Sequence, residues 1–172
     1  MAEPKVCVSL EAISVEEMID EATRANIAGA DYVEVRFDKL YLNKPEPLTM
    51  VNDDGEEYTK MPPVEDWGVK DFSEIDVEKS IESLKEGIPV PVVFTIRSVR
   101  EGGFFSGTEE QRLEILELGI KSQVTFVDLE LSIDKKSREN LMKLAKESNS
   151  KVIASIHETK STPNADDIVE LI

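Results

Sequence analysis

Short segments that favour β-strands alternate with helical segments five times along this 172-residue chain, and the alternation restricts the folds open to it. Each strand-like segment is rich in valine, isoleucine, phenylalanine or threonine, as strands are. The predicted strands are Val6–Leu10, Tyr32–Phe37, Val90–Ile96, Thr125–Leu131 and Lys151–Ile156. Repeated strand–helix units predict parallel strands joined by right-handed crossovers.

Apolar residues at helical spacing predict five helices between and after these strands. Ser14 with Glu17 three residues later forms a capping-box signal, and Gly29 marks the end of that helix. Thr108 and Gln111 repeat the capping signal further along the chain. The predicted helices are Val15–Ala28, Asp76–Glu86, Glu109–Lys121, Ser137–Ser148 and Asn164–Ile172.

An open doubly wound sheet and an incomplete (β/α)8 TIM barrel both fit this α/β pattern. No glycine-rich phosphate loop follows the first strand, where the sequence reads VSLEAIS. Polar residues also cluster at the C-terminal ends of all five strands, where barrel enzymes hold their active sites. Because a whole barrel takes about 250 residues, we expect residues 1–172 to form a single incomplete barrel domain, truncated after about five βα units.

The segment from residue 43 to residue 73 departs from the strand–helix repeat. It is rich in proline and contains the only tryptophan, Trp67. Its turn signal, Asp53-Asp54-Gly55, lies between Leu48–Val51 and Glu57–Lys60 and predicts a hairpin. A connection of this length is usually a functional lid or a disordered insert, and the sequence leaves both interpretations open.

The charge balance excludes several classes of partner. Acidic residues outnumber basic ones by 36 to 20, which gives a net charge of −16. This charge repels nucleic acid and anionic membrane surfaces, so we expect neither as a partner. An anionic ligand requires a local basic cluster that outweighs the overall charge.

The remaining bulk features predict a cytoplasmic protein. No apolar stretch approaches the roughly 20 residues that cross a bilayer, and the N-terminal sequence lacks a signal-peptide pattern. The single cysteine, Cys7, lies in an apolar segment. We expect it to be a buried, inert thiol, because one cysteine cannot form a disulfide within the chain.

Charged residues alternate along the second predicted strand. The alternation places Glu34, Arg36 and Asp38 on one face and apolar residues on the other. Buried charges of this kind need mutual pairing, whereas an edge strand facing water would leave them solvated. The apolar neighbours favour the buried arrangement, because parallel sheets are normally covered on both faces.

Further candidate residues follow the later strands. Arg97 ends the third strand, and its planar guanidinium suits hydroxyl or carboxylate groups of a ligand. Gly102-Gly103 allows a sharp turn or a close approach to a ligand. His157, the only histidine, ends the fifth strand. A lone histidine is more often structural, but this position favours proton transfer.

Four motifs occur in order on successive predicted strands. They are Glu34-x-Arg36-x-Asp38, Thr95-x-Arg97-x-x-x-Glu101-Gly102-Gly103, Asp128-Leu129-Glu130, and His157 followed by Thr162-Pro163. Together they resemble the type I 3-dehydroquinate dehydratases over Lys5–Asp38 and Asp76–Ile172. The resemblance implies a shikimate-pathway lyase of aromatic amino acid biosynthesis, which converts 3-dehydroquinate to 3-dehydroshikimate and water.

The resemblance also implies a role for each matching residue. His157 would be the general base and then the general acid, oriented and tuned by Glu101. Substrate contacts would come from Glu34, Arg36 and Arg97, with Ser9 as a secondary contact, while Asp38 and Asp128 would support the site. No cofactor and no metal ion are implied.

The family forms a Schiff base between the substrate ketone and a lysine on strand six, and this chain has no sixth strand. Lys160, just after strand five, should be exposed and without the desolvation that makes a lysine nucleophilic. The late-barrel arginine that holds the substrate carboxylate is also missing, and Glu158 stands where the family more often has Asp or Asn. We therefore expect the chain alone to be inactive.

Two other interpretations remain. A natural half-barrel would act as a binding or assembly module with a partner chain or a second copy. An aldolase-type Schiff-base barrel fits less well, because of the Glu-x-Arg-x-Asp strand and the single histidine on strand five. In either barrel the open edge of the fifth strand predicts association, and a homodimer is expected.

Overall fold

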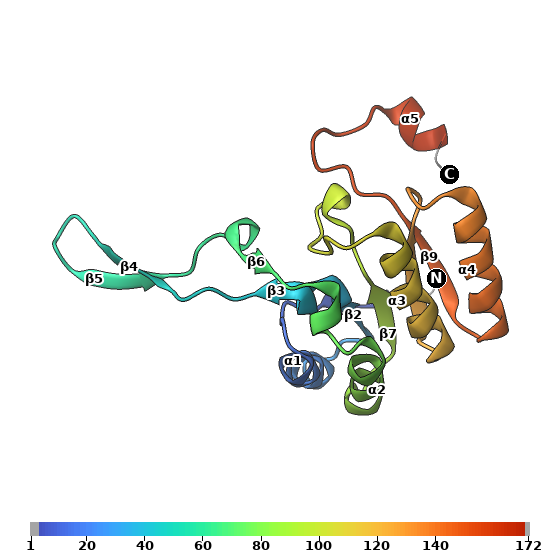
Figure 1. Ribbon diagram of the computed structural model, residues 1–172, viewed down its shortest axis with the longest axis horizontal. Coiled ribbons are helices and arrows are strands. Elements are labelled where there is room, and N and C mark those ends of the chain that lie inside the picture. Colours follow the sequence, from blue (N-terminus) through green and yellow to red (C-terminus); the bar gives the residue numbers. More distant parts are fainter. Residues whose placement is uncertain (1–3, 171–172) are drawn as a thin grey trace.

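The computed structural model describes residues 4–170 of the chain. Within these residues, five parallel strands form one sheet in the order β1-β2-β7-β8-β9 (Figure 1). The strands are β1 (Cys7–Ser9), β2 (Tyr32–Arg36), β7 (Val92–Thr95), β8 (Phe126–Glu130) and β9 (Lys151–Ser155). The five predicted strands are confirmed, although each is shorter than expected. Their spatial order follows the chain order, as in a barrel.

Four helices line one face of this sheet, and each packs against the next. They are α1 (Val15–Ile27), α2 (Val77–Gly87), α3 (Glu109–Lys121) and α4 (Lys135–Glu147). A short helix, α5 (Ala165–Glu170), follows β9. The last two residues of the helix predicted over Asn164–Ile172 lie outside the described residues. No helix between residues 4 and 170 has the length and apolar character of a membrane span.

Local capping fixes where these helices begin. In α3 the capping box is complete, because Gln111 accepts from the Thr108 backbone N–H while Thr108 accepts from that of Gln111. In α1 only half of the predicted box forms. Ser14 accepts from the Glu17 backbone N–H, but the Glu17 carboxylate accepts from the Ser14 hydroxyl instead of from the backbone.

The core lies between the sheet and the helices. Val33, Val35, Phe94, Val127 and Leu129 alternate along three adjacent strands, and all are buried. Their register is continuous, since Val35 pairs with Phe94 and Phe94 pairs with Val127. The residues between them therefore point to the opposite face of the sheet, which carries the charged side chains.

Cys7 is exposed, so the expectation of a buried thiol is wrong. The reason is the position of β1 at the edge of the sheet, where β2 is its only neighbour among the described strands. Val6 and Val8 beside it are also exposed. Burial of a short apolar segment depends on neighbours that come from elsewhere in the chain.

The segment after β2 forms an arm, defined here as residues 44–67, that extends away from the sheet (Figure 1). The 3-10 helix η1 (Phe37–Tyr41) and the antiparallel pair β3 (Leu42–Asn43) and β6 (Gly68–Val69) join the arm to the barrel. The predicted hairpin is present as β4 (Leu48–Val51) and β5 (Glu57–Lys60). Two further 3-10 helices follow it, η2 (Val64–Asp66) and η3 (Phe72–Glu74).

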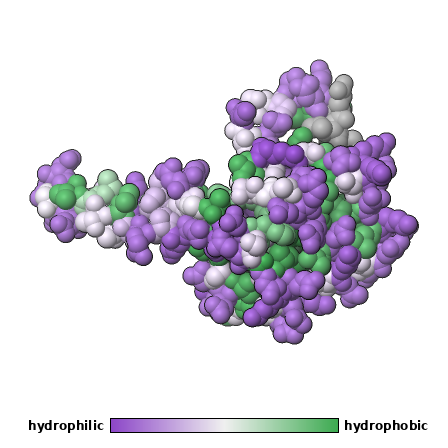
Figure 2. Space-filling model, viewed as in Figure 1, coloured by the Kyte–Doolittle hydropathy of each residue, from purple (hydrophilic) through white to green (hydrophobic). Residues whose placement is uncertain are grey.

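The hairpin is exposed along its whole length, and its apolar side chains face solvent beside polar ones (Figure 2). Asn52 closes the turn, because its side-chain oxygen accepts from the backbone N–H groups of Asp54 and Glu56. At the root, the ring of Tyr41 lies 5.2 Å from that of Phe105 and 6.4 Å from that of Phe72, measured between centroids. The arm is thus anchored at its base and free at its tip.

Candidate active site

The charged side chains predicted as a site gather at the C-terminal ends of the parallel strands. Parallel pairing brings these ends to one edge of the sheet. Ser9 pairs in register with Glu34, and Arg36 pairs with Thr95, two residues before Arg97. The structure therefore brings together residues from distant parts of the sequence, such as Arg36 and Thr95.

His157 and Glu101 lie in direct contact at the site. The imidazole Nδ1 lies 3.0 Å from Glu101 Oε2, although the two residues are 56 positions apart. His157 follows β9, and Glu101 ends the 3-10 helix η4 (Val99–Glu101). The carboxylate is buried, whereas the His157 side chain keeps 24% of its surface exposed. The imidazole is thus held by a buried acid and remains accessible from solvent.

Hydrogen bonding keeps Glu101 ionised. Burial raises the pKa of Glu101, but the nearby Ser132 hydroxyl and the hydrogen bond with His157 outweigh burial and place this pKa below its usual range. An ionised carboxylate on Nδ1 favours the tautomer in which Nδ1 carries the proton and Nε2 is free. The pair therefore has the geometry of a base and the group that orients it.

Arg97 lies between two carboxylates. Its Nη2 is 3.7 Å from Glu34 Oε1, and its Nε is 3.9 Å from Glu130 Oε1. The side chains of Arg97 and Glu34 are both about one-fifth exposed. Both contacts are longer than hydrogen bonds, so the guanidinium retains donors for a ligand.

Arg36 and Asp38 pair with each other in the interior. Arg36 donates from Nε at 2.9 Å and from Nη2 at 2.6 Å to the Asp38 carboxylate, which also accepts from the Phe104 backbone N–H. Burial lowers the pKa of Arg36, but the ion pair outweighs burial and the pKa lies above its usual value. Two of the Arg36 donors are therefore occupied by Asp38. Ser9, the other residue predicted to contact the substrate, is exposed on the edge strand β1.

Asp128 is buried beneath the site with incomplete pairing. Burial raises its pKa, while the nearby Ser155 hydroxyl and the charges of Arg97 and His157 lower it only in part. Its Oδ1 has no hydrogen-bond partner within residues 4–170. Burial and incomplete pairing therefore disfavour the charged form of this carboxylate, a property common in active sites.

The sequence reasoning missed a buried ion-pair network behind the site. Arg112 of α3 donates from Nη1 to Glu130 Oε2 at 2.7 Å. It also donates to the Glu109 carboxylate, from Nε at 3.1 Å and from Nη2 at 2.7 Å. The side chains of Arg112 and Glu130 are each 2% exposed. A signal was available, because Arg112 shares a helix face with the buried Ile115 and Leu116.

Glycines shape the loop that carries Glu101. Gly102 adopts a left-handed conformation with φ of 76°, which favours glycine. A Cβ on Gly103 would lie 2.2 Å from the backbone oxygen of Arg97. The loop therefore packs directly against the residues that follow β7. The close approach predicted at Gly102-Gly103 is thus made to the backbone of Arg97.

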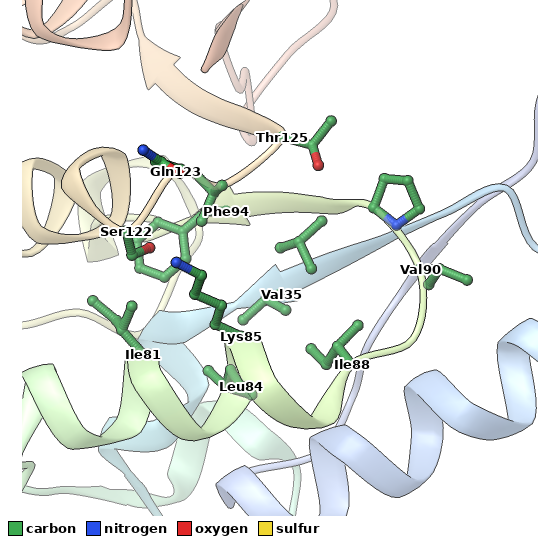
Figure 3. A pocket seen from close by; sticks show the side chains of 13 residues that line it. Val35, Ile81, Leu84, Lys85, Ile88, Val90, Phe94, Ser122, Gln123 and Thr125 are labelled. Carbon is green, nitrogen blue, oxygen red and sulfur yellow. The ribbon is translucent and has the colours of Figure 1, made fainter. Parts of the chain in front are cut away.

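A cleft of about 480 Å³ opens beside the Glu101–His157 pair. It is lined by Arg100, Glu101, Leu131, Ser132, Ile156, His157, Glu158, Thr159 and Lys160. A separate cavity of about 150 Å³ between α2, α3 and β7 has mostly apolar walls (Figure 3). That cavity shares no residue with the cleft and presents no group suited to proton transfer except Lys85 at its rim.

Glu101, Glu130 and His157 also have the composition of a metal site, since each offers one ligand atom within 4.8 Å of the others. Two guanidinium groups already face Glu130, from Arg112 at 2.7 Å and from Arg97 at 3.9 Å. These positive charges oppose a bound cation at the same carboxylate. The arrangement is better suited to handling a proton than to holding a metal ion.

Known proteins resemble the chain over most of its length. The family model for type I 3-dehydroquinase matches residues 6–172. A 3-dehydroquinate dehydratase of Methanosarcina acetivorans is 30% identical over 155 residues, which are 89% of this chain and 52% of that protein. A bifunctional 3-dehydroquinate dehydratase/shikimate dehydrogenase of Arabidopsis thaliana is 28% identical over 97% of this chain and 22% of that protein.

A solved structure gives the same fold. The 3-dehydroquinate dehydratase of Enterococcus faecalis superimposes with a TM-score of 0.73 at 24% identity and covers 99% of this chain and 60% of that chain. The five strand–helix units thus correspond to part of a TIM barrel, as predicted from the sequence, and the chain spans about half the length of several relatives that it matches. The chain belongs to the type I 3-dehydroquinase family.

Proposed function

We propose that this chain supplies the proton-transferring part of a 3-dehydroquinate dehydratase site, a hydro-lyase that forms 3-dehydroshikimate and water. The observation that carries the proposal is the 3.0 Å contact between His157 Nδ1 and Glu101 Oε2 beside an open cleft. A base oriented by a carboxylate is the arrangement that proton abstraction next to a carbonyl requires. Membership of the family gives the reaction.

In this proposal His157 transfers the same proton twice. Its free Nε2 takes a proton from the carbon next to the substrate carbonyl, and the electron pair of that C–H bond forms the new double bond. The imidazolium then gives the proton to the leaving hydroxyl as the C–O bond breaks, so that water departs. Glu101 stabilises the transient imidazolium from Nδ1.

The substrate is an anion, and Arg97 is the cationic group that we assign to it. The guanidinium is partly exposed and lies between Glu34 and Glu130, so it can donate to substrate hydroxyl or carbonyl oxygens. Glu34 is placed to accept from a substrate hydroxyl. We assign a positioning role to Arg36, which holds Asp38 and the Phe104 backbone in place.

The Schiff-base step needs a desolvated lysine. Lys39 is the buried lysine of residues 4–170, and it is paired with Glu11. Lys160 lines the cleft but is exposed. Neither environment generates a reactive amine, so we propose that this chain by itself binds the substrate without forming the covalent adduct.

Binding is testable because the chain contains one histidine. The C–H signals of His157 are the only imidazole signals in the proton NMR spectrum, and 3-dehydroquinate should shift them in a saturable manner. Arg97→Met should weaken the response at least tenfold, while Lys143→Met, on the exposed face of α4, should leave it unchanged. Signals that do not respond to the substrate in the parent chain would contradict the proposed site.

Covalent capture provides the complementary measurement. Borohydride reduces an iminium and fixes the substrate to its lysine, so intact mass reports any adduct. We expect no adduct on this chain. An adduct on Lys160 would show that an exposed lysine serves as the nucleophile and would overturn this part of the proposal.

Self-association is a second candidate property. The edge strands β1 and β9 each pair on one side only within the described residues, and Val6, Val8 and Ile153 are exposed on them. Open edges of this kind favour pairing with another chain, which supports a homodimer. Sedimentation velocity over a range of concentrations should reveal a dimer, and a monomer at every concentration would contradict this.

A further inference from the structure

Glu130 lies between Arg97, the proposed substrate-binding group, and the Glu101–His157 pair. It ends β8, and its side chain is 2% exposed. Its atoms approach Arg97 on one side, and one of its oxygens lies within 4.8 Å of ligand atoms of Glu101 and His157 on the other. No role for Glu130 follows from the proton transfers described above.

The two carboxylate oxygens of Glu130 have different surroundings. Oε2 accepts from Arg112 Nη1 at 2.7 Å and from the Ser98 hydroxyl at 3.4 Å. Oε1 is buried and has no hydrogen-bond partner among the described residues, although Arg97 Nε lies 3.9 Å away. One oxygen therefore holds the side chain in place, and the other is left facing the site.

Burial raises the pKa of Glu130, and the charge of Arg112 beside it opposes this rise only in part. A carboxylate away from water is very unfavourable unless a cation pairs with it. The guanidinium of Arg112 is itself fixed, because Glu109 accepts from its other two nitrogens. Glu109 in turn accepts from Arg100 at 3.1 Å, so the network continues to the protein surface.

We propose that Glu130, held by Arg112, is a positioning residue of the site, whose free oxygen keeps Arg97 aimed at the ligand and whose charge stabilises the protonated form of His157. This inference rests on the proposed function, since it names the part that Glu130 plays in the same site. It differs from the role of Glu101, because Glu130 acts across space without a hydrogen bond to the imidazole.

Several other charged groups face His157 and set the background for this effect. Glu101 contacts it from η4, Asp128 interacts with its charge from β8, and Arg97, which follows β7, interacts with Asp128. Glu34 of β2 acts more remotely, through Arg97. The cleft adds three exposed charges, which are Arg100, Glu158 and Lys160. The test therefore removes one charge and leaves all of these in place.

The test is a pH titration of the His157 imidazole by proton NMR, without substrate. Glu130→Gln keeps the shape and the hydrogen bond to Arg112 while removing the charge, so the midpoint of the titration should fall by about 0.5–1 pH unit. Glu147→Gln removes an exposed charge from α4, where Glu147 pairs with Lys143. This control should leave the midpoint unchanged.

A folded E130Q chain with an unchanged midpoint would overturn the proposal, as would an equal shift in E147Q. If E130Q fails to fold, the double replacement Glu130→Met with Arg112→Met is the second variant, because apolar substitutes for a buried ion pair are often tolerated. The His157 midpoint in this double variant should also lie below that of the parent chain, since Glu130 lies nearer to His157 than Arg112 does. An unchanged midpoint would again count against a role for Glu130. If the proposed function is wrong, the His157 signals of the parent chain will instead not shift when 3-dehydroquinate is added.

Discussion

His157 Nδ1 lies 3.0 Å from Glu101 Oε2, so the only histidine of the chain is paired with a buried carboxylate at the C-terminal edge of the sheet. The contact joins η4 to the residue that follows β9, two elements that are adjacent only because the sheet orders β7, β8 and β9 side by side. The fold thereby pairs an imidazole with a buried carboxylate from distant parts of the sequence.

Replacing Glu101 should change how stability depends on pH. Burial raises the pKa of Glu101, yet the nearby Ser132 hydroxyl and the hydrogen bond with His157 leave it below the ordinary value of 4.5. A depressed folded-state pKa stabilises the protein above the ordinary value, and this stabilisation disappears as the pH falls through the folded-state pKa. Glu101→Gln should therefore be less stable than the parent near neutral pH, and the difference in Tm should shrink in acid. A difference that is constant with pH would contradict the assignment.

Asp128 should behave in the opposite way. Burial raises its pKa above the ordinary value of 3.8, so the folded state binds the proton more tightly and stability increases as the pH falls through the raised value. Burial disfavours the charged form, so Asp128→Asn should increase the free energy of unfolding at neutral pH. Denaturant unfolding measures this, with the exposed Asp20→Asn as the control. A loss of stability in D128N would contradict the account.

The Arg36–Asp38 pair should be essential for stability. Asp38→Ala leaves a buried guanidinium without its partner and removes the acceptor of the Phe104 N–H, so it should cost about 3–5 kcal/mol. Glu117→Ala breaks an exposed pair with Lys121 and should cost less than about 0.5 kcal/mol. Equal losses in the two variants, measured by urea unfolding, would show that the burial of the first pair is unimportant.

Gly103 should not tolerate a side chain. A Cβ there would lie 2.2 Å from the backbone oxygen of Arg97 and 2.5 Å from its carbonyl carbon, and backbone atoms cannot move aside cheaply. Gly103→Ala should therefore lower stability by about 2–3 kcal/mol and weaken the response of His157 to 3-dehydroquinate. Gly68→Ala meets only ordinary contacts at 3.6 Å and is the matched control. A G103A chain as stable as G68A would contradict the packing described.

The strands and the main helices were predictable because they depend on local patterns. Alternation along β2 correctly separated Val33 and Val35, which are buried, from Glu34 on the charged face. The Thr108 capping box correctly located the start of α3. In each case neighbouring residues along the chain determine the outcome.

The errors and omissions concern contacts between distant segments. Cys7 lies in an apolar segment, but its exposure depends on the edge position of β1, which no local pattern reveals. Arg112 was overlooked because a charged residue in a helix is normally solvated. Its pairing with Glu130 depends on where α3 packs against the end of β8.

The most direct test of the account is a dehydratase assay on a chimaera that joins residues 6–172 to the part of the Methanosarcina acetivorans protein beyond the matched region. The conjugated enone of 3-dehydroshikimate absorbs in the ultraviolet and reports turnover. The account predicts that the chimaera is active, that His157→Ala lowers kcat by about 10²- to 10⁴-fold, and that Glu158→Gln, beside it on the same loop, has little effect. A His157→Ala chimaera that keeps the activity of its parent would contradict the central claim that His157 transfers the proton.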